Sequence, residues 1–433
     1  MPSVYENGFA VSPEELRHVL RPIGEAGGLP NAAYTSVEHF LLERDALIGR
    51  TWAACAFTDT IPNEPFAQPL EFMGLPLLIT RDQQGALRVF HNVCSHRGMK
   101  LVGEPTSVRG LINCRYHGWS YSTIGELKRT PHIGGVNQHS CAGFANSAHG
   151  LKPVPSAVFL GILFVNLSGD APEFERHIAP LRRRAGALVG EHGWSRLKPS
   201  RDHSHLCLEV RCNWKLAVEN YCEAYHLPWV HPALNSYSRL EDHDCFVDSE
   251  QFSGQRSLAY RLSEVAGTRL PRLDDWPADR MHIAEYPSLY PNVLLGFHAD
   301  HAFAVILTPL AADSTREDVR ILYVGEGAVA DQYESCRAAT HEAWRGVFGE
   351  DVFAVQGLQE GRVSPGFRGG VFSPVMDAPT HHFHQWVAGR LIAAAGAGES
   401  SAPDSPVGLH EALERRCEQQ HGDASDRAPA DHP

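Results

Sequence analysis

The pattern of apolar and polar positions changes near residue 168. From about residue 47 to residue 167, short apolar runs alternate with turn-forming segments such as GEPTS and PHIGGVNQHSCAGF. Short runs bounded by turn residues are typical of antiparallel strands joined by loops. The predicted strands cover residues 77–80, 86–90, 110–114, 119–121 and 158–167. We therefore expect a small domain of short antiparallel strands at 47–167.

Beyond residue 168, helical and strand-like patterns are mixed. Strand-like runs recur at 205–210, 293–297, 303–308 and 319–324, and helical patterns at 181–188, 215–225, 332–347 and 382–393. This mixture favours an antiparallel sheet with helices packed on it. The predicted fold class is therefore α+β, with a second, larger domain at 168–395.

The two ends of the chain differ in character. Ser12, Pro13 and Glu15 stand in the order of a capping box, which predicts a short leading helix. Residues 1–46 are expected to pack on the larger domain. The stretch 396–433 is rich in Gly, Ser, Pro, Asp and Ala, which predicts a disordered tail interrupted at most by a short helix at 409–416.

Charge and composition exclude several classes of protein. The chain has 38 Lys and Arg against 51 Asp and Glu, a net charge of −13, which opposes binding to nucleic acid. Its longest apolar run, Ala157 to Val165, has nine residues, whereas a membrane-spanning helix needs about 20. The amino terminus lacks the pattern of an export signal, so we expect a cytoplasmic location. Ten cysteines are too few for a disulfide framework.

Four residues form a first candidate metal site. Cys94 and His96 occur as C-x-H, and Cys114 and His117 as C-x₂-H. Two thiolates and two imidazoles fit either a structural zinc or a [2Fe-2S] cluster. In a zinc finger the second pair usually consists of two histidines, whereas here each pair has one Cys and one His in the same order. The spacing therefore favours a cluster to which each loop gives one ligand for each iron.

Three residues form a second candidate site. On a straight helix His226 and His231 would point about 140° apart, so both can face one ion only if the backbone bends. Pro228 is expected to provide that bend. Glu223 lies three residues before His226 and is therefore expected on the same helical face, where it could orient the imidazole or carry a proton. In isolation, a His pair near a Glu is more often ordinary packing.

Together the two motifs resemble a known family. A C-x-H and C-x₂-H pair followed by NWKLAVEN-x₂-E-x-Y-H-x₄-H-P resembles the catalytic alpha subunit of the Rieske non-haem iron oxygenases, or ring-hydroxylating oxygenases. The resemblance implies a Rieske [2Fe-2S] domain and a catalytic domain with a mononuclear Fe(II). It assigns His226 and His231 as iron ligands. It also assigns Asp351 as the third ligand, with Glu350 as the alternative.

The same resemblance implies partners and a reaction. Glu223 takes the place of an acid that bridges a Rieske histidine of one subunit to an iron-bound histidine of the next, which implies a ring of subunits, most commonly a homotrimer. Electrons would come from NAD(P)H through a separate reductase or ferredoxin, since no nucleotide-binding motif precedes a helix here. With O₂, the chain would hydroxylate or demethylate a small organic substrate, either an aromatic or a quaternary ammonium compound.

Two rival functions stay open at this point: an electron-transfer protein without oxygenase activity, and a zinc-stabilised binding module. Five other histidines are interpreted as packed or surface residues: His298, His301, His381, His382 and His384. Three other cysteines are interpreted as buried thiols: Cys207, Cys212 and Cys222.

Overall fold

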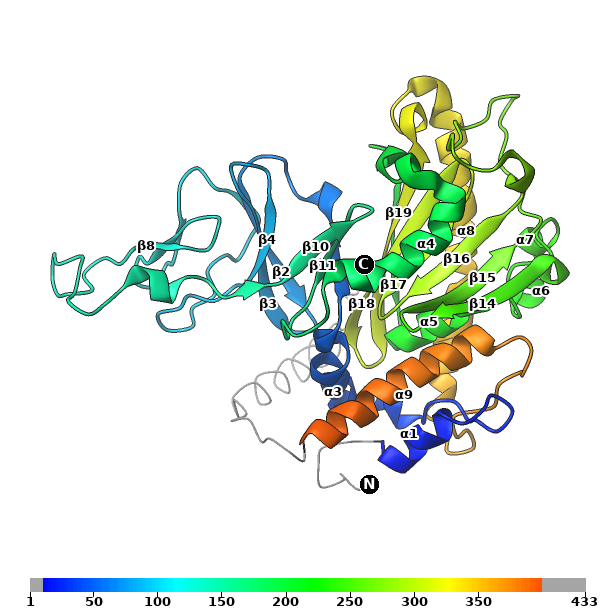
Figure 1. Ribbon diagram of the computed structural model, residues 1–433, viewed down its shortest axis with the longest axis horizontal. Helices are drawn as coiled ribbons and strands as arrows, with labels where there is room; N and C mark the ends of the chain where they lie inside the picture. Colours follow the sequence, from blue (N-terminus) through cyan, green and yellow to red (C-terminus); the bar gives the residue numbers. More distant parts are fainter. Residues whose placement is uncertain (1–10, 399–433) are drawn as a thin grey trace, which may run out of the picture. The chain divides into compact units, whose positions relative to one another are not determined.

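The computed structural model describes residues 11–398, and its first part, after three short helices, consists of small antiparallel sheets (Figure 1). One has the strand order β1-β11-β10, a second β5-β2-β3-β4-β9, and a third β6-β7-β8. The strands are β1 (Ala53–Phe57), β2 (Phe66–Phe72), β3 (Leu75–Arg81), β4 (Leu87–His91), β5 (Thr106–Ser107), β6 (Ile112–Asn113), β7 (Ser120–Tyr121), β8 (Leu127–Arg129), β9 (Pro153–Val154), β10 (Ser156–Phe159) and β11 (Ile162–Val165). The predicted small antiparallel domain is confirmed.

One predicted strand was wrong in detail. The run 158–167 forms two paired strands, β10 and β11, rather than one. Leu160 and Gly161 between them have φ values of 50° and 73°. Two successive residues with positive φ make the tight turn that joins hairpin strands. The apolar pattern therefore continued across a turn that only Gly161 indicated.

The second part is built on an eight-stranded antiparallel sheet. Its order is β12-β19-β18-β17-β16-β15-β14, and β13 also pairs with β19. The strands are β12 (Leu197–Pro199), β13 (His205–Val210), β14 (His243–Ser249), β15 (Phe252–Ser257), β16 (Ala284–Leu289), β17 (Val293–Phe297), β18 (His301–Ala311) and β19 (Ser314–Val324). The predicted antiparallel sheet is confirmed, although the sequence did not reveal strands β12 and β14–β16.

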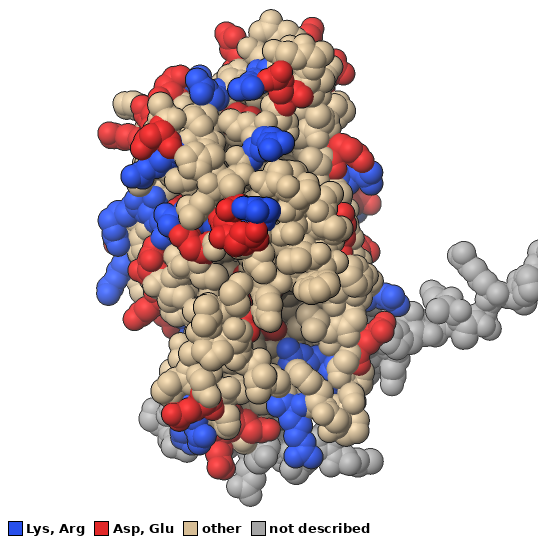
Figure 2. Space-filling model, turned by 90° about the vertical axis from the view of Figure 1, so that its right-hand side faces the viewer, with Lys and Arg blue, Asp and Glu red and all other residues tan. Residues whose placement is uncertain are grey.

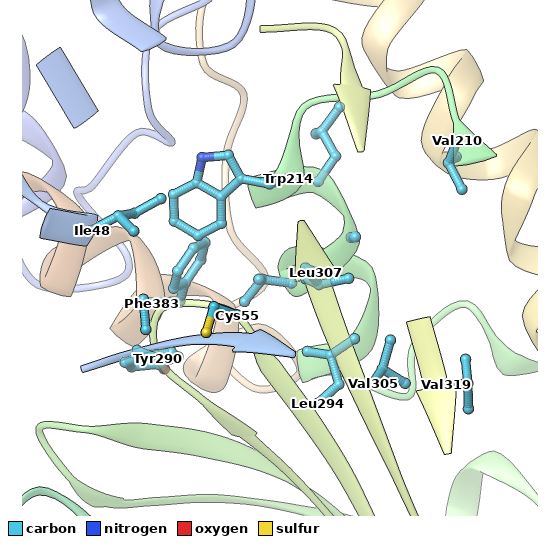
Figure 3. Close-up of a cluster of buried hydrophobic side chains, with 14 of the residues drawn as sticks. Ile48, Cys55, Val210, Trp214, Tyr290, Leu294, Val305, Leu307, Val319 and Phe383 are labelled. Atoms are coloured by element: carbon cyan, nitrogen blue, oxygen red, sulfur yellow. The ribbon is translucent and has the colours of Figure 1, made fainter. Parts of the chain in front are cut away.

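Strand β18 shows how the sheet is buried on both faces. Phe303, Val305 and Leu307 point into one hydrophobic cluster, and the alternate residues Ala304 and Ile306 point into another. Because side chains of a strand alternate between faces, such a continuous apolar run indicates cover on both sides. Figure 3 shows the first cluster, in which Trp214 and Phe383 approach the side chains of the sheet, with ring centroids 5.8 Å apart.

Nine α-helices accompany the sheets in the described part of the chain. They are α1 (Pro13–Val19), α2 (Ala32–Thr35), α3 (Val37–Ala46), α4 (Phe174–Arg196), α5 (Trp214–Cys222), α6 (Leu227–Val230), α7 (Pro232–Asn235), α8 (Glu334–Gly361) and α9 (Ala378–Gly398). The capping box predicted for the first helix is present, with Ser12 and Glu15 bonded to each other's backbone N–H.

Helices α4 and α8 are longer than their sequence patterns predicted. Helix α4 begins at Phe174 and includes Pro180, which forgoes one backbone hydrogen bond. Its buried residues on both sides of Pro180, among them Ile178 and Leu181, join the same cluster. Packing of this face against the sheet therefore outweighs the local preference of proline.

Other predictions meet different outcomes. Cys212 and Cys222 are buried as expected, but Cys207 is exposed, because β13 lies at the edge of the sheet and turns this residue outward. The predicted tail at 396–433, with its short helix, lies almost wholly outside the described residues. Among residues 11–398, no helix has the length and apolar character that crossing a bilayer requires. On the face drawn in Figure 2, acidic and basic side chains are interspersed.

Candidate metal centres

Two turns with the same local geometry carry the first set of candidate ligands. In one, the N–H of Gly98 donates to the carbonyl of Cys94 at 3.0 Å, and in the other Gly118 donates to Cys114 at 3.0 Å. Both glycines have positive φ values, 76° and 71°. This backbone conformation is strained for residues that have a side chain, but not for glycine. Each turn therefore needs its glycine to bring the cysteine and the following histidine to the same side.

The four candidate ligands converge from these turns. Cys94 and Cys114 are 2% and 3% exposed and form no disulfide, whereas His96 and His117 are exposed, with ring centroids 4.6 Å apart. Partial burial, His117 and Arg97 lower the pKa of His96, which favours the neutral ring that binds metals. The sequence placed these residues together correctly.

The arrangement discriminates between the two metal groups considered from the sequence. A single zinc ion binds four donor atoms, each at about 2.0–2.3 Å from the ion. The four donor atoms must therefore lie close to one another. Among the described residues, two groups have three donor atoms within 4.8 Å of one another. Neither group contains Cys94, His96, Cys114 or His117. No three of these four donors are therefore as close together as a single ion requires.

Two aromatic residues support this centre, and no role was predicted for either of them. Trp119 stacks on His96 with ring centroids 4.6 Å apart and an angle of 9° between the planes. The hydroxyl of Tyr121 lies 3.2 Å from the sulfur of Cys94 and accepts a hydrogen bond from the N–H of Ser95. Both residues follow His117 within five positions, so the motif could have been read further to include them.

Helix α5 positions the second set and is held by buried ionic contacts. Asn213 caps it by accepting from the N–H of Lys215. The ammonium of Lys215 lies 2.7 Å from the carboxylate of Glu43, and both side chains are fully buried. Burial disfavours the charged form of Glu43, yet Lys215 and His39 outweigh it and lower its pKa. The pair therefore ties α5 to α3, far away in the sequence.

The structure brings His226, His231 and Asp351 together. Their ligand atoms lie within 4.8 Å of one another, and Nε2 of His231 is 3.0 Å from the Asp351 carboxylate. Nε2 of His226 is 3.8 Å from the same oxygen. Two imidazoles and one carboxylate on one side of an ion match the facial set that holds non-haem Fe(II) and leaves positions open. Another group of three possible donors, the carboxylates of Asp202 and Glu334 and the imidazole of His203, lies nearer the surface.

Three side chains orient these candidate ligands. Nδ1 of His226 lies 2.7 Å from Glu223, and Nδ1 of His231 lies 2.8 Å from Glu350. The amide of Asn220 donates to Asp351 at 2.8 Å. Carboxylates that accept from Nδ1 leave Nε2 as the metal-binding atom. Each candidate ligand thus has a partner that fixes its orientation.

The pKa of His231 shows the character of this site. Burial disfavours protonation of its ring, but the carboxylates of Asp351 and Glu350 outweigh burial and raise its pKa. The negative charge that stabilises a proton on this buried imidazole would also stabilise a bound cation. The donor set therefore fits a divalent metal ion.

The local helix geometry expected from the sequence was wrong. Helix α5 ends at Cys222, and Glu223 is extended with φ −127° and ψ 163°, so it does not share a helical face with His226. Pro228 is the second residue of α6, which begins at Leu227, and does not bend a longer helix; His231 caps the C-terminal end of α6 with a non-helical backbone. Glu223 reaches His226 because the chain leaves the helix between them. Glu350, the alternative ligand, contacts His231 rather than joining the group of three.

A small cavity opens beside the three candidate ligands. Its volume is about 50 Å³, enough for about four water molecules. Five aromatic side chains share its lining with His226, His231 and Asp351: Tyr221, Tyr286, Phe303, Trp344 and Phe348. A substrate bound there would be small and would meet a mostly apolar surface to which these five rings contribute.

Comparison with known proteins agrees with this geometry. Residues 51–140 match the family model of the Rieske [2Fe-2S] domain, and residues 196–393 match that of the ring hydroxylating alpha subunit catalytic domain. The carnitine monooxygenase oxygenase subunit of Acinetobacter baumannii is 24% identical over 78% of this chain and 86% of its own length. The chloroplastic choline monooxygenase of Arabidopsis thaliana is 24% identical over 84% and 82%.

Solved structures show the same fold. A quaternary ammonium Rieske monooxygenase in complex with L-carnitine superposes with a TM-score of 0.67 at 21% identity, covering 87% of this chain and 98% of that one. Naphthalene 1,2-dioxygenase from Rhodococcus sp. bound to indole superposes with a TM-score of 0.65 at 18% identity, covering 90% and 99%.

Proposed function

We propose that this chain, which belongs to the ring-hydroxylating oxygenase alpha subunits that carry a Rieske domain, oxidises a small quaternary ammonium compound. As the oxygenase of a multicomponent system, it uses O₂ and electrons from a separate reductase. The observation that carries the substrate class is the small aromatic cavity beside His226, His231 and Asp351.

The chemistry of a quaternary ammonium group matches that cavity. Such a group carries a positive charge but has no N–H, so it cannot donate a hydrogen bond to a polar atom of the cavity. Aromatic faces attract it by about 0.5–2 kcal/mol per ring. Similarity to carnitine and choline monooxygenases supports the same class. An aromatic compound, as for the naphthalene dioxygenase of the same fold, is the alternative.

For the Rieske centre, we propose Cys94, His96, Cys114 and His117 as ligands of the [2Fe-2S] cluster. When bound, a cluster with two histidine ligands transfers single electrons at a potential of about −150 to +300 mV. The turns closed by the two glycines hold the cysteines inward and the histidines outward. The hydroxyl of Tyr121 is placed to donate to the sulfur of Cys94 and so to stabilise its thiolate form.

For the mononuclear centre, we propose Nε2 of His226, Nε2 of His231 and the carboxylate of Asp351 as the ligands of Fe(II). When bound in such a set, Fe(II) keeps positions open for O₂ beside the substrate. Glu223 accepts the Nδ1 proton of His226, and Glu350 accepts that of His231, so both Nε2 lone pairs are directed toward Asp351.

The assembly belongs to the same proposal. His96 and His117 are exposed. Glu223 of a neighbouring copy would supply a carboxylate partner for one of them in a homotrimer and would link the two centres between subunits. The domain limits 1–46, 47–167, 168–395 and 396–433 and the cytoplasmic location also stay predictions.

The test supplies the purified holoprotein with NAD(P)H and a generic reductase. Carnitine, choline, glycine betaine and a set of aromatic acids are each added in air. O₂ consumption and product mass are then followed, and we expect turnover coupled to product only with ammonium compounds. Coupled oxidation of an aromatic acid alone would contradict the substrate class. The His226→Ala variant, expected to consume no O₂ with any compound, is the control for chemistry at this centre.

A further inference from the structure

Behind the aromatic lining lies a pair of buried histidines that the proposed reaction does not use. His298 directly follows β17 and His301 begins β18, and a two-residue turn separates the two histidines. The N–H of His298 donates to the carbonyl of His301 at 2.9 Å. Residues that flank such a turn face each other across the hairpin. Their rings therefore stack, with centroids 4.2 Å apart and planes at 6°.

Both rings bind polar atoms of the cavity lining. Nε1 of Trp344 donates to Nε2 of His301 at 2.9 Å. The hydroxyl of Tyr286 lies 3.1 Å from Nε2 of His298. Neither histidine lines the cavity, so Trp344 and Tyr286 turn their polar atoms away from it. The surface that these two rings present to the cavity therefore consists only of carbon atoms and the aromatic faces.

The contact with Trp344 fixes the charge of His301. An indole N–H can only donate, so Nε2 of His301 must accept and the ring must be neutral. The remaining proton then sits on Nδ1 and donates to the carboxylate of Asp300 at 2.6 Å. Both side chains are buried. The His301 and Asp300 pair consequently carries a charge of −1 directly behind Trp344.

His298 adds no opposing charge. It is fully buried, and its Nδ1 has no hydrogen-bond partner. Burial lowers its pKa well below the ordinary value, so the ring stays neutral. The region behind Trp344 and Tyr286 is therefore net negative, and a buried negative charge attracts a cation more strongly than it would in water.

We propose that Asp300, His301 and His298 are positioning residues that hold Trp344 and Tyr286 as a cation-selective wall of the substrate cavity. The inference rests on the proposed function, because it explains how the cavity would distinguish a quaternary ammonium group from an uncharged group of the same shape. His301 orients the indole, Asp300 fixes the tautomer of His301 and supplies the charge, and His298 orients the phenol.

The experiment compares ligands that differ only in charge at one atom. Choline is paired with 3,3-dimethyl-1-butanol, and glycine betaine with 3,3-dimethylbutanoate. Each is titrated into the holoprotein without O₂ by isothermal calorimetry, so that binding is measured and not turnover. We expect the wild type to prefer the ammonium member. His301→Leu should reduce this preference about tenfold, equal to 1.4 kcal/mol.

Two further variants separate positioning from general damage. His301→Gln restores an acceptor for the indole N–H, so it should recover most of the preference. His177→Leu replaces another buried histidine, beside Phe174 of a different hydrophobic cluster, and should leave the ratio of affinities unchanged. A purely structural effect would weaken both members of a pair equally and would not change the ratio. Asp300→Asn, which keeps the shape of the side chain, is used if His301→Leu does not fold.

The outcomes distinguish the two proposals. If the wild type prefers the ammonium member but the ratio is unchanged in His301→Leu, or in Asp300→Asn where that variant replaces it, the inference about the wall is wrong and the proposed substrate class stands. If the wild type prefers neither ammonium compound, the substrate class is wrong, and the inference falls with it.

Discussion

The two pairs of histidines proposed to bind metal lie in different surroundings. His96 and His117 are exposed and held by turns whose hydrogen bonds join residues a few positions apart. His231 is buried and His226 partly so, and each is oriented by a carboxylate. A centre that exchanges electrons with a partner must reach the surface, whereas one that handles a substrate must limit access of water.

The difference also concerns how each pair is assembled. The turns of the Rieske domain need only a local motif with a glycine at a fixed position. The catalytic pair depends on α8 for Asp351 and Glu350, and on α3 for the contact that holds α5. Local turns define one centre, and long-range packing defines the other. We therefore expect mutations to separate the two centres.

The largest expected effect is loss of one centre while the other stays. Asp351→Ala should lower mononuclear iron from about one per chain to near zero, because two neutral imidazoles alone hold Fe(II) weakly. Cys114→Ser should abolish the cluster instead. Iron and sulfide analysis with electron paramagnetic resonance measures both. Loss of both centres in either variant would show that they are not independent.

The next effect concerns the buried ion pair beneath the catalytic centre. Lys215→Met leaves the Glu43 carboxylate buried without its main partner, which should lower the free energy of unfolding by about 3–5 kcal/mol. Denaturant unfolding followed by tryptophan fluorescence measures it. The matched control in the Rieske domain is Lys128→Met, whose solvent-exposed pair with Glu126 should contribute little to stability. Equal effects would refute the contrast.

A buried histidine without a carboxylate sharpens the comparison. Burial lowers the pKa of His177 to about 4, so between pH 6.5 and 4 the unfolded chain binds a proton that the fold excludes. Stability should therefore fall by about 3 kcal/mol as the pH drops through this window. His177→Leu should remove that part of the acid sensitivity in unfolding measured from pH 7 to 4. His192→Leu, an exposed position on the same helix, should not.

The smallest effect tests the partner of His231. Glu350→Gln keeps the shape of the side chain but weakens its hold on Nδ1, so the affinity for Fe(II) should fall about 10- to 100-fold. Equilibrium dialysis against a metal buffer measures the affinity. Glu360→Gln, an exposed carboxylate on the same helix, serves as the control. Unchanged affinity in Glu350→Gln would mean that the contact does not orient the ligand.

Much of the fold followed from the periodicity of the chain. The strands 205–210 and 293–297 have the predicted bounds, because the first alternates between buried and exposed positions at the edge of the sheet and the second is a continuous apolar run buried on both faces. Strands β14 to β16 were missed, since they carry polar residues such as Ser253, Gln255 and Glu285, which are buried in partnerships made by other segments. The sequence near these residues does not show which distant residues will bind them.

The sequence by itself determined the Rieske turns and named the candidate ligands on them, because spacing and glycine positions suffice for a motif closed by its own backbone. Only the tertiary structure decided the rest. It showed that Glu223 reaches His226 from outside the helix, that Glu350 orients His231, and that Asp300 lies behind the aromatic lining. These contacts join side chains through the packing of α5, α8 and the sheet, which short-range periodicity does not encode.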